Sequence, residues 1–299
     1  MSNKAPAIQV SSAQEWVDYE LIDSGDGLKL ERFGKYTFSR PEAQAVWSPA
    51  RPAGGWLKAD AVFQTTAEEN GGHWLMNKKL PEYWTMEYKG IKFKVQAGAS
   101  RHLGVFPEQA VHWDWMTAAI SGANRPVKVL NLFGYTGIAS LFAAKAGAQV
   151  THIDASKKAI SWARENQSLS SLNGSPIRWI VDDALKFIER EIRRGSFYDG
   201  IILDPPKFGR GPKGEVWEFY KLLPTLLNSC KEVLAPNPLF ILLTAYAVKA
   251  SSITLKQAVE EIMRDFHGTT TAGEIGIREK SAGRFLSTAI FSRWLRAGI

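Results

Sequence analysis

The chain is 299 residues long, with 45% hydrophobic and 22% charged residues, the composition of an ordinary globular protein with room for a substantial core. Its formal net charge of +7 favours an anionic partner such as nucleic acid, while its single cysteine, Cys230, excludes an internal disulfide and a cysteine-based metal cluster, and we predict no metal site. Residues 1–6 lack the apolar core of a signal peptide, and the longest apolar run, residues 239–248, is too short to span a bilayer, so we expect a cytoplasmic protein that binds no membrane.

Residues 1–95 predict a small, mostly β domain with short helices. Turn signals occur at residues 24–27 and 52–55, and the segments 28–33 and 88–95 alternate apolar with polar residues, as half-buried antiparallel strands do. Tryptophans and tyrosines are scattered through the domain. They can stack on RNA bases, but tryptophans more often form the core of a small β domain, and we favour the core. Binding of substrate or RNA is the candidate role of this domain.

A glycine-rich segment, residues 96–109, connects this domain to an aromatic-rich helix expected over residues 112–120. Pro107 followed by Glu108 suits the start of a helix. His102 lies in the connecting segment. Because a lone histidine in a loop is more often neither a ligand nor a general base, we assign it no role.

Residues 127–154 predict the unit around which the rest of the chain is organised. It opens with an almost continuous apolar run, typical of a parallel strand that is covered on both faces. Gly134 and Gly137 then allow a tight turn and the close approach of a ligand to the backbone. After a helix over residues 138–146, the next strand ends in Asp154, at the edge where open α/β sheets bind their ligands. Because only two glycines are present and the G-x-G-x-x-G pattern of a dinucleotide motif is absent, an ordinary strand–helix–strand unit is the alternative.

Helices and strands alternate through the remainder of the chain. Ser156 is an expected N-cap, and helices are expected over residues 156–172, 185–194, 216–234 and 255–266. Strands are expected over residues 177–181, 198–203, 239–243, 270–277 and 285–294. The last two strands are joined without a helix, so they must form an antiparallel hairpin. The pattern predicts a doubly wound α/β fold over residues 96–299, with a mostly parallel, seven-stranded sheet and a terminal antiparallel hairpin.

Four motifs fall at the ends of successive expected strands: Asn131-Leu132-Phe133-Gly134-Tyr135-Thr136-Gly137, Asp154, Asp183-Ala184 and Asp204-Pro205-Pro206. With the closing hairpin they resemble a class I S-adenosylmethionine-dependent methyltransferase, which has a Rossmann-like sheet. The segments Asp204–Phe208 and Gly104–Gln109 look more closely like the bacterial large-subunit ribosomal RNA methyltransferases, a group with 5-methylcytosine and 7-methylguanine enzymes. The resemblance covers about residues 98–299, and no segment resembles the PUA module of that group. It implies S-adenosylmethionine as the cofactor and ribosomal RNA as the substrate.

The resemblance implies a cofactor site at the strand ends. Asp154 can accept hydrogen bonds from the ribose hydroxyls, and Asp183 from the adenine amine, while the Ala184 N–H addresses a ring nitrogen. Asp182 can exchange roles with Asp183. Capping a helix is the alternative for Asp154, although Ser156 can fill that role, and an acid in the first helical turn is the alternative for Asp183. The expected cofactor-binding residues are Phe106, Gln109, Asn131, Phe133, Gly134, Tyr135, Thr136, Gly137, Asp154, Ala155, Ser156, Asp183, Ala184 and Asp204.

Asp204, Pro205, Pro206, Lys207 and Phe208 form the expected catalytic motif. Two successive prolines make the loop rigid, so it can hold an acid and backbone carbonyls against a planar base and orient the attacking nitrogen. Phe208 can stack on an extruded base, and Lys207 can contact a phosphate or guanine O6. A proline-terminated strand without a role is the alternative. Beyond the motif, residues 209–214 predict a mobile basic loop that closes over RNA, or a plain surface loop.

One departure from the resembled group concerns cysteine. The 5-methylcytosine enzymes attack the base with a thiolate, because carbon 5 of cytosine is not nucleophilic until an adduct forms. In those relatives the cysteine follows the fifth strand, but residues 242–247 contain none, and Cys230 lies well before that strand. Transfer to a base nitrogen needs no thiolate and fits better. Tyr246 is a candidate for lining the pocket.

We therefore expect a methyltransferase that modifies a base nitrogen of RNA. The alternatives are a methyltransferase with a protein or small-molecule acceptor, a nicotinamide-dependent oxidoreductase, and a non-catalytic RNA-binding protein with the same fold. The missing third glycine, the Asp-Pro-Pro strand end and the terminal hairpin argue against the oxidoreductase. A homo-oligomer is compatible with the sequence, which does not identify the modified nucleotide.

Overall fold

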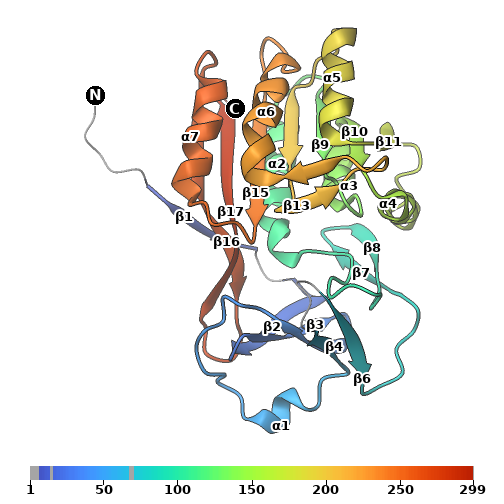
Figure 1. Cartoon of the computed structure of the whole chain (residues 1–299). Helices are drawn as coiled ribbons and strands as arrows, with labels where there is room; N and C mark the ends of the chain where they lie inside the picture. The colour runs from blue at the N-terminus through green and yellow to red at the C-terminus, as the bar shows by residue number, and fades with distance from the viewer. Residues whose placement is uncertain (1–6, 14–15, 67–70, 299) are drawn as a thin grey trace. The chain divides into compact units, whose positions relative to one another are not determined.

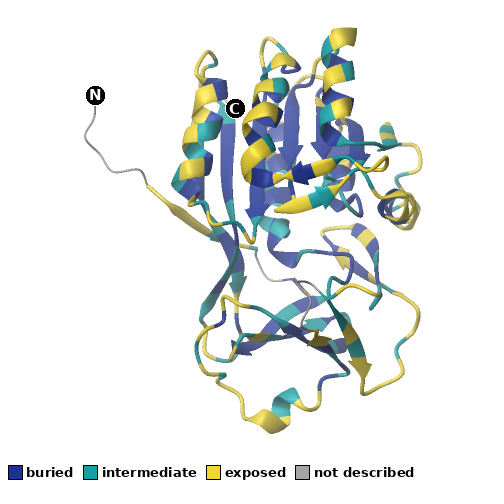
Figure 2. Ribbon diagram, viewed as in Figure 1, coloured by how far each residue is buried: buried dark blue, intermediate teal, exposed yellow. Residues whose placement is uncertain are grey.

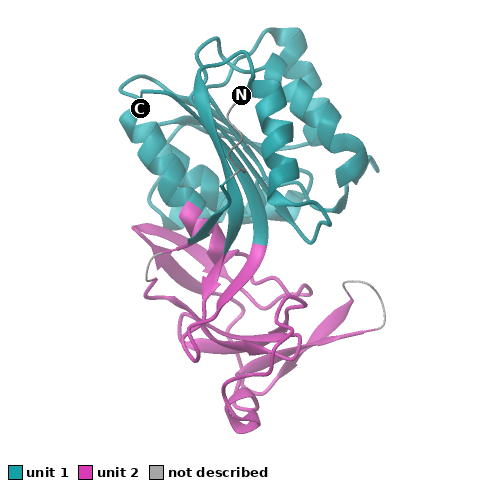
Figure 3. Cartoon of the chain, turned by 90° about the vertical axis from the view of Figure 1, so that its left-hand side faces the viewer, with its two compact units in different colours: residues 1–11, 112–275, 289–299 teal, residues 12–111, 276–288 magenta. Residues whose placement is uncertain are grey.

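The computed structural model describes residues 7–13, 16–66 and 71–298. Residues 1–6, on which the expectation about a signal peptide rests, lie outside the described residues. The chain forms two compact units: unit 1 comprises residues 1–11, 112–275 and 289–299, and unit 2 comprises residues 12–111 and 276–288 (Figure 3). The predicted boundary between a small β-rich domain over residues 1–95 and an α/β domain over residues 96–299 stays a prediction.

An eight-stranded sheet forms the body of unit 1 (Figure 1). Its strands are β1 (Gln9–Ser12), β9 (Lys128–Leu132), β10 (Gln149–Asp154), β11 (Ile177–Val181), β12 (Gly200–Leu203), β15 (Phe240–Tyr246), β16 (Gly268–Arg278) and β17 (Phe285–Arg296), of which the last two reach into unit 2. The strand order is β1-β16-β17-β15-β12-β9-β10-β11. The strands from β15 to β11 in this order are parallel, and β17 is antiparallel to β15. The predicted α/β fold class and its antiparallel terminal hairpin are confirmed.

The eighth strand corrects the predicted count of seven. Strand β1 adds to the edge of the sheet beside β16, where Gly273 has no side chain to keep it away. A Cβ atom at Gly273 would lie 1.8 Å from the carbonyl oxygen of Gln9. Because β1 is short and mostly exposed, it has no alternating apolar face by which the sequence would have revealed it.

Helices cover both faces of this sheet, whose central strands are buried (Figure 2). They are α2 (Ala110–Gly122), α3 (Ile138–Lys145), α4 (Lys157–Leu169), α5 (Ala184–Arg194), α6 (Phe219–Glu232) and α7 (Ser252–Met263). Helices α5, α6 and α7 lie side by side, and their apolar residues form one core with strand residues such as Leu132, Ile153 and Leu203. On α2, the Trp113 ring stacks on Phe142 of α3 at 5.2 Å. Among the helices of the described residues, none combines the length and the hydropathy that crossing a bilayer requires.

Helix α6 begins three residues later than predicted. Residues Val216–Glu218, expected to be its first turn, instead form strand β14, which pairs with β13 (Phe208–Arg210) as an antiparallel hairpin. Helix α7 begins three residues earlier than predicted, because the Ser251 side chain caps it by accepting a hydrogen bond from the Thr254 N–H. The other expected helices and strands of unit 1 are present, with shifts of up to three residues at their ends.

Unit 2 is mostly β, as predicted. Its five-stranded sheet has the order β2-β3-β4-β5-β6, with β2 (Tyr19–Gly25), β3 (Leu28–Phe33), β4 (Tyr36–Pro41), β5 (Ala61–Thr65) and β6 (Gly72–Met76). The remaining elements are α1 (Ala53–Trp56), the hairpin β7 (Trp84–Tyr88) and β8 (Ile91–Val95), and the 3₁₀-helix η1 (Pro107–Gln109). Residues 88–95, expected as one alternating strand, are divided by a turn at Lys89 and Gly90, both of which have positive φ.

The tryptophans of unit 2 form part of its core, the interpretation that we favoured. Trp16 is buried, and the other four are half-buried with their indole N–H groups bonded inside the unit. The acceptors are the carbonyl of Ser24 for Trp47, the carboxylate of Asp23 for Trp56, the carbonyl of Ser100 for Trp74 and the carbonyl of Phe33 for Trp84.

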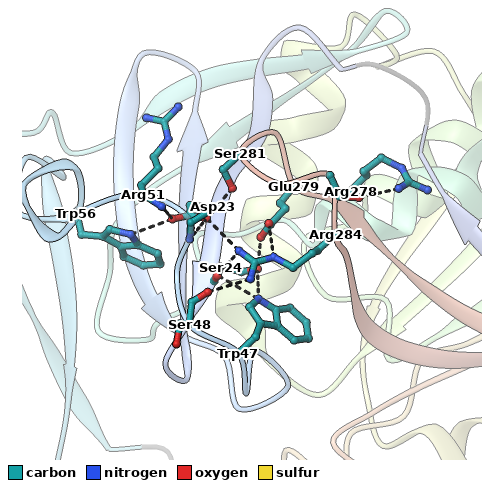
Figure 4. Close-up of polar contacts among 12 residues, drawn as sticks. Asp23, Ser24, Trp47, Ser48, Arg51, Trp56, Arg278, Glu279, Ser281 and Arg284 are labelled. Atoms are coloured by element: carbon teal, nitrogen blue, oxygen red, sulfur yellow. Dashed lines mark hydrogen bonds and ion pairs between the residues drawn. The ribbon is translucent and has the colours of Figure 1, made fainter.

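A buried polar network joins residues 276–288, at the tip of the β16–β17 hairpin, to β2 (Figure 4). Glu279 accepts hydrogen bonds from Ser24 Oγ and, at 2.5 Å, from Arg284 Nε. Ser281 Oγ donates to Asp23 Oδ1 at 2.6 Å. Burial raises the pKa of Asp23, but the hydrogen bonds from Ser281 and the backbone outweigh it and lower that pKa overall. The tip of the hairpin is thus held by paired, charged groups.

Candidate active site at the carboxyl edge of the sheet

The register of the parallel strands brings the predicted motifs to one edge of the sheet. Leu132 is level with Ile153 on one side and with Leu203 on the other. The residues that follow therefore leave the sheet together, and these include Asp154 and Asp204. Since β9 has β10 on one side and β12 on the other, this edge contains the point at which the strand order reverses, where open α/β sheets bind ligands.

The turn after β9 has an unusual backbone. Phe133 and Tyr135 have φ angles of 60° and 51°, and Gly137 has 81°. Positive φ is uncommon for aromatic residues, and such conformations concentrate at functional sites. The turn is closed by hydrogen bonds from the Gly134 N–H to the Ile153 carbonyl and from the Gly137 N–H to the Gly134 carbonyl, each 3.0 Å long. The predicted tight turn is therefore present.

The structure adds a second reason for each glycine. A Cβ atom at Gly134 would lie 2.2 Å from Cε1 of His152, and one at Gly137 would lie 2.7 Å from Cβ of Ala163. His152 is fully buried, and its Nδ1 lies 2.9 Å from Ser140 Oγ, which accepts a hydrogen bond from the Asn131 side chain. Burial lowers the pKa of His152 to about 3, so the imidazole is neutral. The glycines are required by the packing of the protein itself.

Asp154 is held by the backbone on both oxygens. Oδ2 accepts a hydrogen bond from the Tyr135 N–H and Oδ1 from the Ser156 N–H, both at 2.8 Å. Ser156 Oγ, in turn, accepts from the Ala159 N–H and caps α4, so Ser156 has the capping role that we expected for it. Burial raises the pKa of Asp154 in spite of the two N–H donors. Because a carboxylate has about four acceptor positions, Asp154 fits a ligand that brings two more donors, such as a ribose diol.

Asp183 and Asp182 lie one strand further along the edge. Asp183 caps α5, since its Oδ1 accepts from the Lys186 N–H at 3.0 Å, which is the helix-start alternative considered above. Asp182 accepts from the Asp183 N–H at 2.9 Å and forms an ion pair with Arg190. Ala184 is the first residue of α5, so its N–H has no partner within the helix. Which of the two acids contacts adenine stays a prediction.

The Asp204–Phe208 motif leaves β12 and enters the β13–β14 hairpin. Trp217 of β14 holds the hairpin, because its indole N–H donates to the Pro206 carbonyl at 2.6 Å and its ring centroid lies 5.0 Å from that of Phe133. The Lys207 carbonyl accepts from the Phe219 N–H at 3.0 Å. The buried indole of Trp217 thus joins the Asp204–Phe208 segment, expected to be catalytic, to the glycine turn.

Residues 209–214, expected as a mobile loop, contain the turn of this hairpin. The Gly211 N–H donates to the Glu215 carbonyl at 2.8 Å, and Glu215 Oε1 pairs with Lys186 Nζ of α5 at 2.6 Å. The hydrogen bond from Lys186 lowers the pKa of Glu215 to about 2. Gly209 and Arg210 of this segment are paired in β13, and its turn is tethered to α5 through Glu215. The mobility of the segment and its closure over RNA stay predictions.

The exposed residues of the motif are the ones expected to meet a substrate. Pro206, Lys207 and Phe208 are exposed, whereas Pro205 is buried and Asp204 is half-buried. Tyr246 ends β15 at the same edge and is half-buried. Cys230 is buried in α6, and burial raises the pKa of its thiol, so it does not supply a thiolate.

Phe106 and Gln109 belong to unit 2 and are described within it. Phe106 precedes η1, and its ring centroid lies 4.9 Å from that of His102. Burial, with the charges of Arg40 and Arg101, lowers the pKa of His102 to about 3. The roles of Phe106 and Gln109 at the cofactor stay predictions.

Sequence reasoning missed three supporting residues of this site: His152, Lys186 and Trp217. His152 reads as an ordinary strand residue, and Trp217 was placed in a helix. Val216, Trp217 and Glu218 do not alternate apolar with polar in the sequence, and the alternation of their exposure appears only in the structure. A run of three residues is too short to establish a period of two.

Residues 44–265 match the family model for S-adenosylmethionine-dependent methyltransferases. The chain is 52% identical to the SAM-dependent methyltransferase from Agrobacterium tumefaciens, with a TM-score of 0.92 over 98% of this chain and 94% of that one. It is also similar to the ribosomal RNA large subunit methyltransferase K/L of Shewanella frigidimarina, at 32% identity over 63% of this chain and 26% of the relative. The ribosomal RNA large subunit methyltransferase I of Photobacterium profundum is 35% identical over 45% of this chain and 33% of the relative. The matched region therefore spans about a quarter to a third of the length of these curated relatives.

Proposed function

The chain belongs to the S-adenosylmethionine-dependent methyltransferase family, and from this premise we propose that it methylates a base nitrogen of ribosomal RNA. The observation that carries the proposal is the juxtaposition, at one sheet edge, of the Asp154 carboxylate and the rigid Asp204-Pro205-Pro206 loop with its exposed Phe208. Both relatives named for ribosomal RNA methyltransferases support the choice of acceptor. A ribosomal RNA substrate also implies the cytoplasm as the compartment.

In the cofactor half of the site, Asp154 accepts the two ribose hydroxyls with the acceptor positions that the backbone leaves open. The edge from Asp204 on β12 to Asp183 after β11 spans three strand spacings, about 14 Å, which suits an extended nucleoside with its amino acid tail. The Ala184 N–H and Asp183 or Asp182 recognise the adenine ring. S-adenosylmethionine supplies a methyl group on a positively charged sulfur when it is bound.

In the acceptor half, the chain holds a flat base in one orientation. Pro205 and Pro206 fix the backbone after β12, Phe208 stacks on the extruded base, and Asp204 accepts a hydrogen bond from the base edge. Lys207 contacts a phosphate or guanine O6. Positioning of this kind supplies most of the catalysis in an in-line displacement.

The chemistry of the site favours nitrogen over carbon as the methylated atom. Attack at carbon 5 of cytosine requires a thiolate, and the one cysteine of the chain is buried in α6 with a raised pKa. A base nitrogen has its own lone pair and needs no covalent adduct. This difference distinguishes methylation of a base nitrogen from methylation of carbon 5 of cytosine.

The amino-terminal domain contributes a surface for the substrate. Unit 2 contains a groove of about 480 Å³ lined by residues from the segments 76–82 and 96–98, including Lys78 and Lys79. The two lysines of the groove suit the phosphates of RNA, while Glu82 and apolar residues such as Leu80 and Pro81 complete its lining. The family match removes the nicotinamide-dependent oxidoreductase from the alternatives, while a protein or small-molecule acceptor is an outcome of the test below.

The test is the transfer of label from S-adenosylmethionine to RNA from cells that lack the gene, followed by mapping of the labelled nucleotide. We expect label on a base nitrogen of large-subunit ribosomal RNA. Asp204→Asn should lower kcat on the order of a hundredfold, because the base is no longer held in line. Asp154→Asn should weaken the binding of S-adenosylhomocysteine by about tenfold or more in calorimetric titration, because a charged acceptor is lost.

The matched control is Asp265→Asn, an exposed acid that follows α7 at the opposite edge of the sheet and pairs with Lys231. This variant should resemble the wild type in both measurements. Label in a protein or small-molecule fraction, and in no RNA, would overturn the acceptor that we propose. Full activity of Asp204→Asn would overturn the assignment of the site.

A further inference from the structure

The β13–β14 hairpin has one face packed on the protein and one face in solvent. Gly209 is paired with Trp217, and Trp217 is buried. Phe208 is paired with Glu218, and Arg210 with Val216, and all four are exposed. Because side chains alternate along a strand and paired residues share a side, these four lie together on the outer face of the hairpin.

Two large apolar side chains, Phe208 and Val216, lie in solvent on this outer face, beside the charged Arg210 and Glu218. Phe208 is 55% exposed and Val216 is 46% exposed, while Tyr220, in the turn of α6 that follows, is 56% exposed. Arg210 makes no ion pair within the part of the chain that the structure describes. Large apolar side chains in solvent on a built surface mark sites of interaction.

The hairpin is also held in place before any partner arrives. Its inner face is anchored by Trp217, whose indole is bonded to Pro206 and packed on Phe133. Its turn is anchored by the pair between Glu215 and Lys186. A surface that is already ordered binds without the entropic cost of ordering a loop.

We propose that the outer face of the β13–β14 hairpin binds unpaired RNA nucleotides next to the target base. This inference rests on the proposed function, in which Phe208 holds the target base. A neighbouring base packs on Val216, its phosphate pairs with Arg210, and Glu218 accepts from an exocyclic amine. An unpaired base has a free face that can pack on an exposed apolar side chain beside a cation, whereas the bases of a duplex present no free faces.

Charge decides between RNA and a protein as the occupant. Arg210 and Lys213 lie on the hairpin, and of its two acids Glu215 is already paired with Lys186. The surface that remains is cationic, with Glu218 as its one acid. An apolar, cationic strip suits a nucleic acid strand, and its phosphates would neutralise the strip.

The experiment measures binding separately from methyl transfer. The full chain, saturated with S-adenosylhomocysteine, is titrated into fluorescein-labelled 15-nucleotide oligoadenylate and, in a second series, into the duplex of that strand with oligouridylate. We expect the single strand to bind more tightly than the duplex. Arg210→Ala should weaken binding of the single strand by about tenfold and Val216→Ser by about threefold.

Two control variants remove a similar charged and a similar apolar side chain at the opposite edge of the sheet. Arg193→Ala removes an exposed arginine near the end of α5, and Phe197→Ser removes a 50% exposed side chain beyond it. Both should bind the single strand within twofold of the wild type. Equal losses in the controls, or unchanged binding by Arg210→Ala and Val216→Ser, would overturn the inference.

The outcomes separate this inference from the proposed function. If the wild type methylates ribosomal RNA and the hairpin variants keep its binding and its KM, the inference alone fails. If the wild type methylates no RNA, the proposed function fails, whatever the binding assay gives. Variants that lose activity on intact ribosomal particles but not on naked RNA would show that the face binds a protein, which also overturns the inference.

Discussion

Gly134 is predicted from the sequence as a place where a ligand approaches the backbone, but its nearest neighbour in the protein is a histidine. A Cβ atom there would lie 2.2 Å from His152 Cε1, and the fully buried ring has little room to move. We predict that Gly134→Ala destabilises the protein by about 1–3 kcal/mol, as overpacking in a core does. Urea unfolding of the variant and the wild type measures this difference.

A double-mutant cycle identifies the cause. In a His152→Ala background the ring is gone, so Gly134→Ala should cost much less than it does in the wild type. The comparison variant is Gly174→Ala, at an exposed glycine where an added Cβ meets no atom within 4 Å. Additive effects of Gly134→Ala and His152→Ala would show that the clash is not the reason for the glycine.

At the scale of single residues, the sequence predicts roles that depend on neighbours in the chain. Ser156 was expected to cap the helix in place of Asp154, because a serine at that position can accept an N–H of the first turn, and the structure has Ser156 as the cap. The contact between Gly134 and His152 was not expected. It joins the turn after β9 to a residue of the adjacent strand β10, and it depends on a register that only the folded sheet supplies.

At the scale of elements, the tether between the β13–β14 hairpin and α5 makes a prediction about local stability. Lys186→Ala should raise the hydrogen-exchange rates of the Gly211 and Lys213 amides, because both donate to Glu215, which the variant releases from α5. Hydrogen exchange followed by mass spectrometry measures the effect. Lys158→Ala, an exposed lysine in the first turn of α4, is the matched control.

The pH dependence of this tether follows from the two pKa shifts. The hydrogen bond between the partners lowers the pKa of Glu215 to about 2 and raises the pKa of Lys186. A lowered acid pKa gives stability that is complete above the ordinary value near 4.5 and is lost as pH falls through about 2. A raised lysine pKa gives stability that is complete below its ordinary value and is lost as pH rises through the higher one.

The protection of the hairpin amides, corrected for intrinsic exchange, should therefore stay constant between about pH 5 and pH 9. A fall in protection within that range in the wild type would contradict the assignment of the tether. The same amides in Lys186→Ala should show the higher rates at every pH in the range.

The elements themselves show where prediction from sequence ends. Repeated alternation of apolar strands and helices predicted the α/β sheet and the closing hairpin, because each long element carries its own period and its own caps. The β13–β14 hairpin was missed because each of its strands has three residues, Phe208–Arg210 and Val216–Glu218, too few to distinguish a strand from a helix. Its stability comes from Trp217, whose partners Phe133 and Pro206 are distant in the chain or across a turn.

At the scale of the whole molecule, the basic character of the chain is unevenly distributed. Unit 1 has 22 Lys and Arg against 16 Asp and Glu, a net charge of +6, and unit 2 has 15 against 14, a net charge of +1, which together give the +7 of the chain. The excess positive charge thus belongs to the unit with the candidate active site. The amino-terminal domain, expected from sequence as a candidate RNA-binding domain, contributes little net charge to that binding.

This partition predicts which charges set the salt dependence of RNA binding. Each phosphate contact to a single strand contributes about 0.7 to the slope of log K against log salt. The double variant Lys213→Ala/Lys221→Ala, in the hairpin turn and the first turn of α6, should therefore reduce the slope by about 1.4. Lys35→Ala/Lys58→Ala removes the same charge from exposed positions of unit 2 and should leave the slope nearly unchanged. Titrations of the full chain with oligoadenylate at several salt concentrations measure the slopes of both double variants. An equal or larger change of the slope in the unit 2 variant would show that the net charge of a unit does not indicate where the RNA binds.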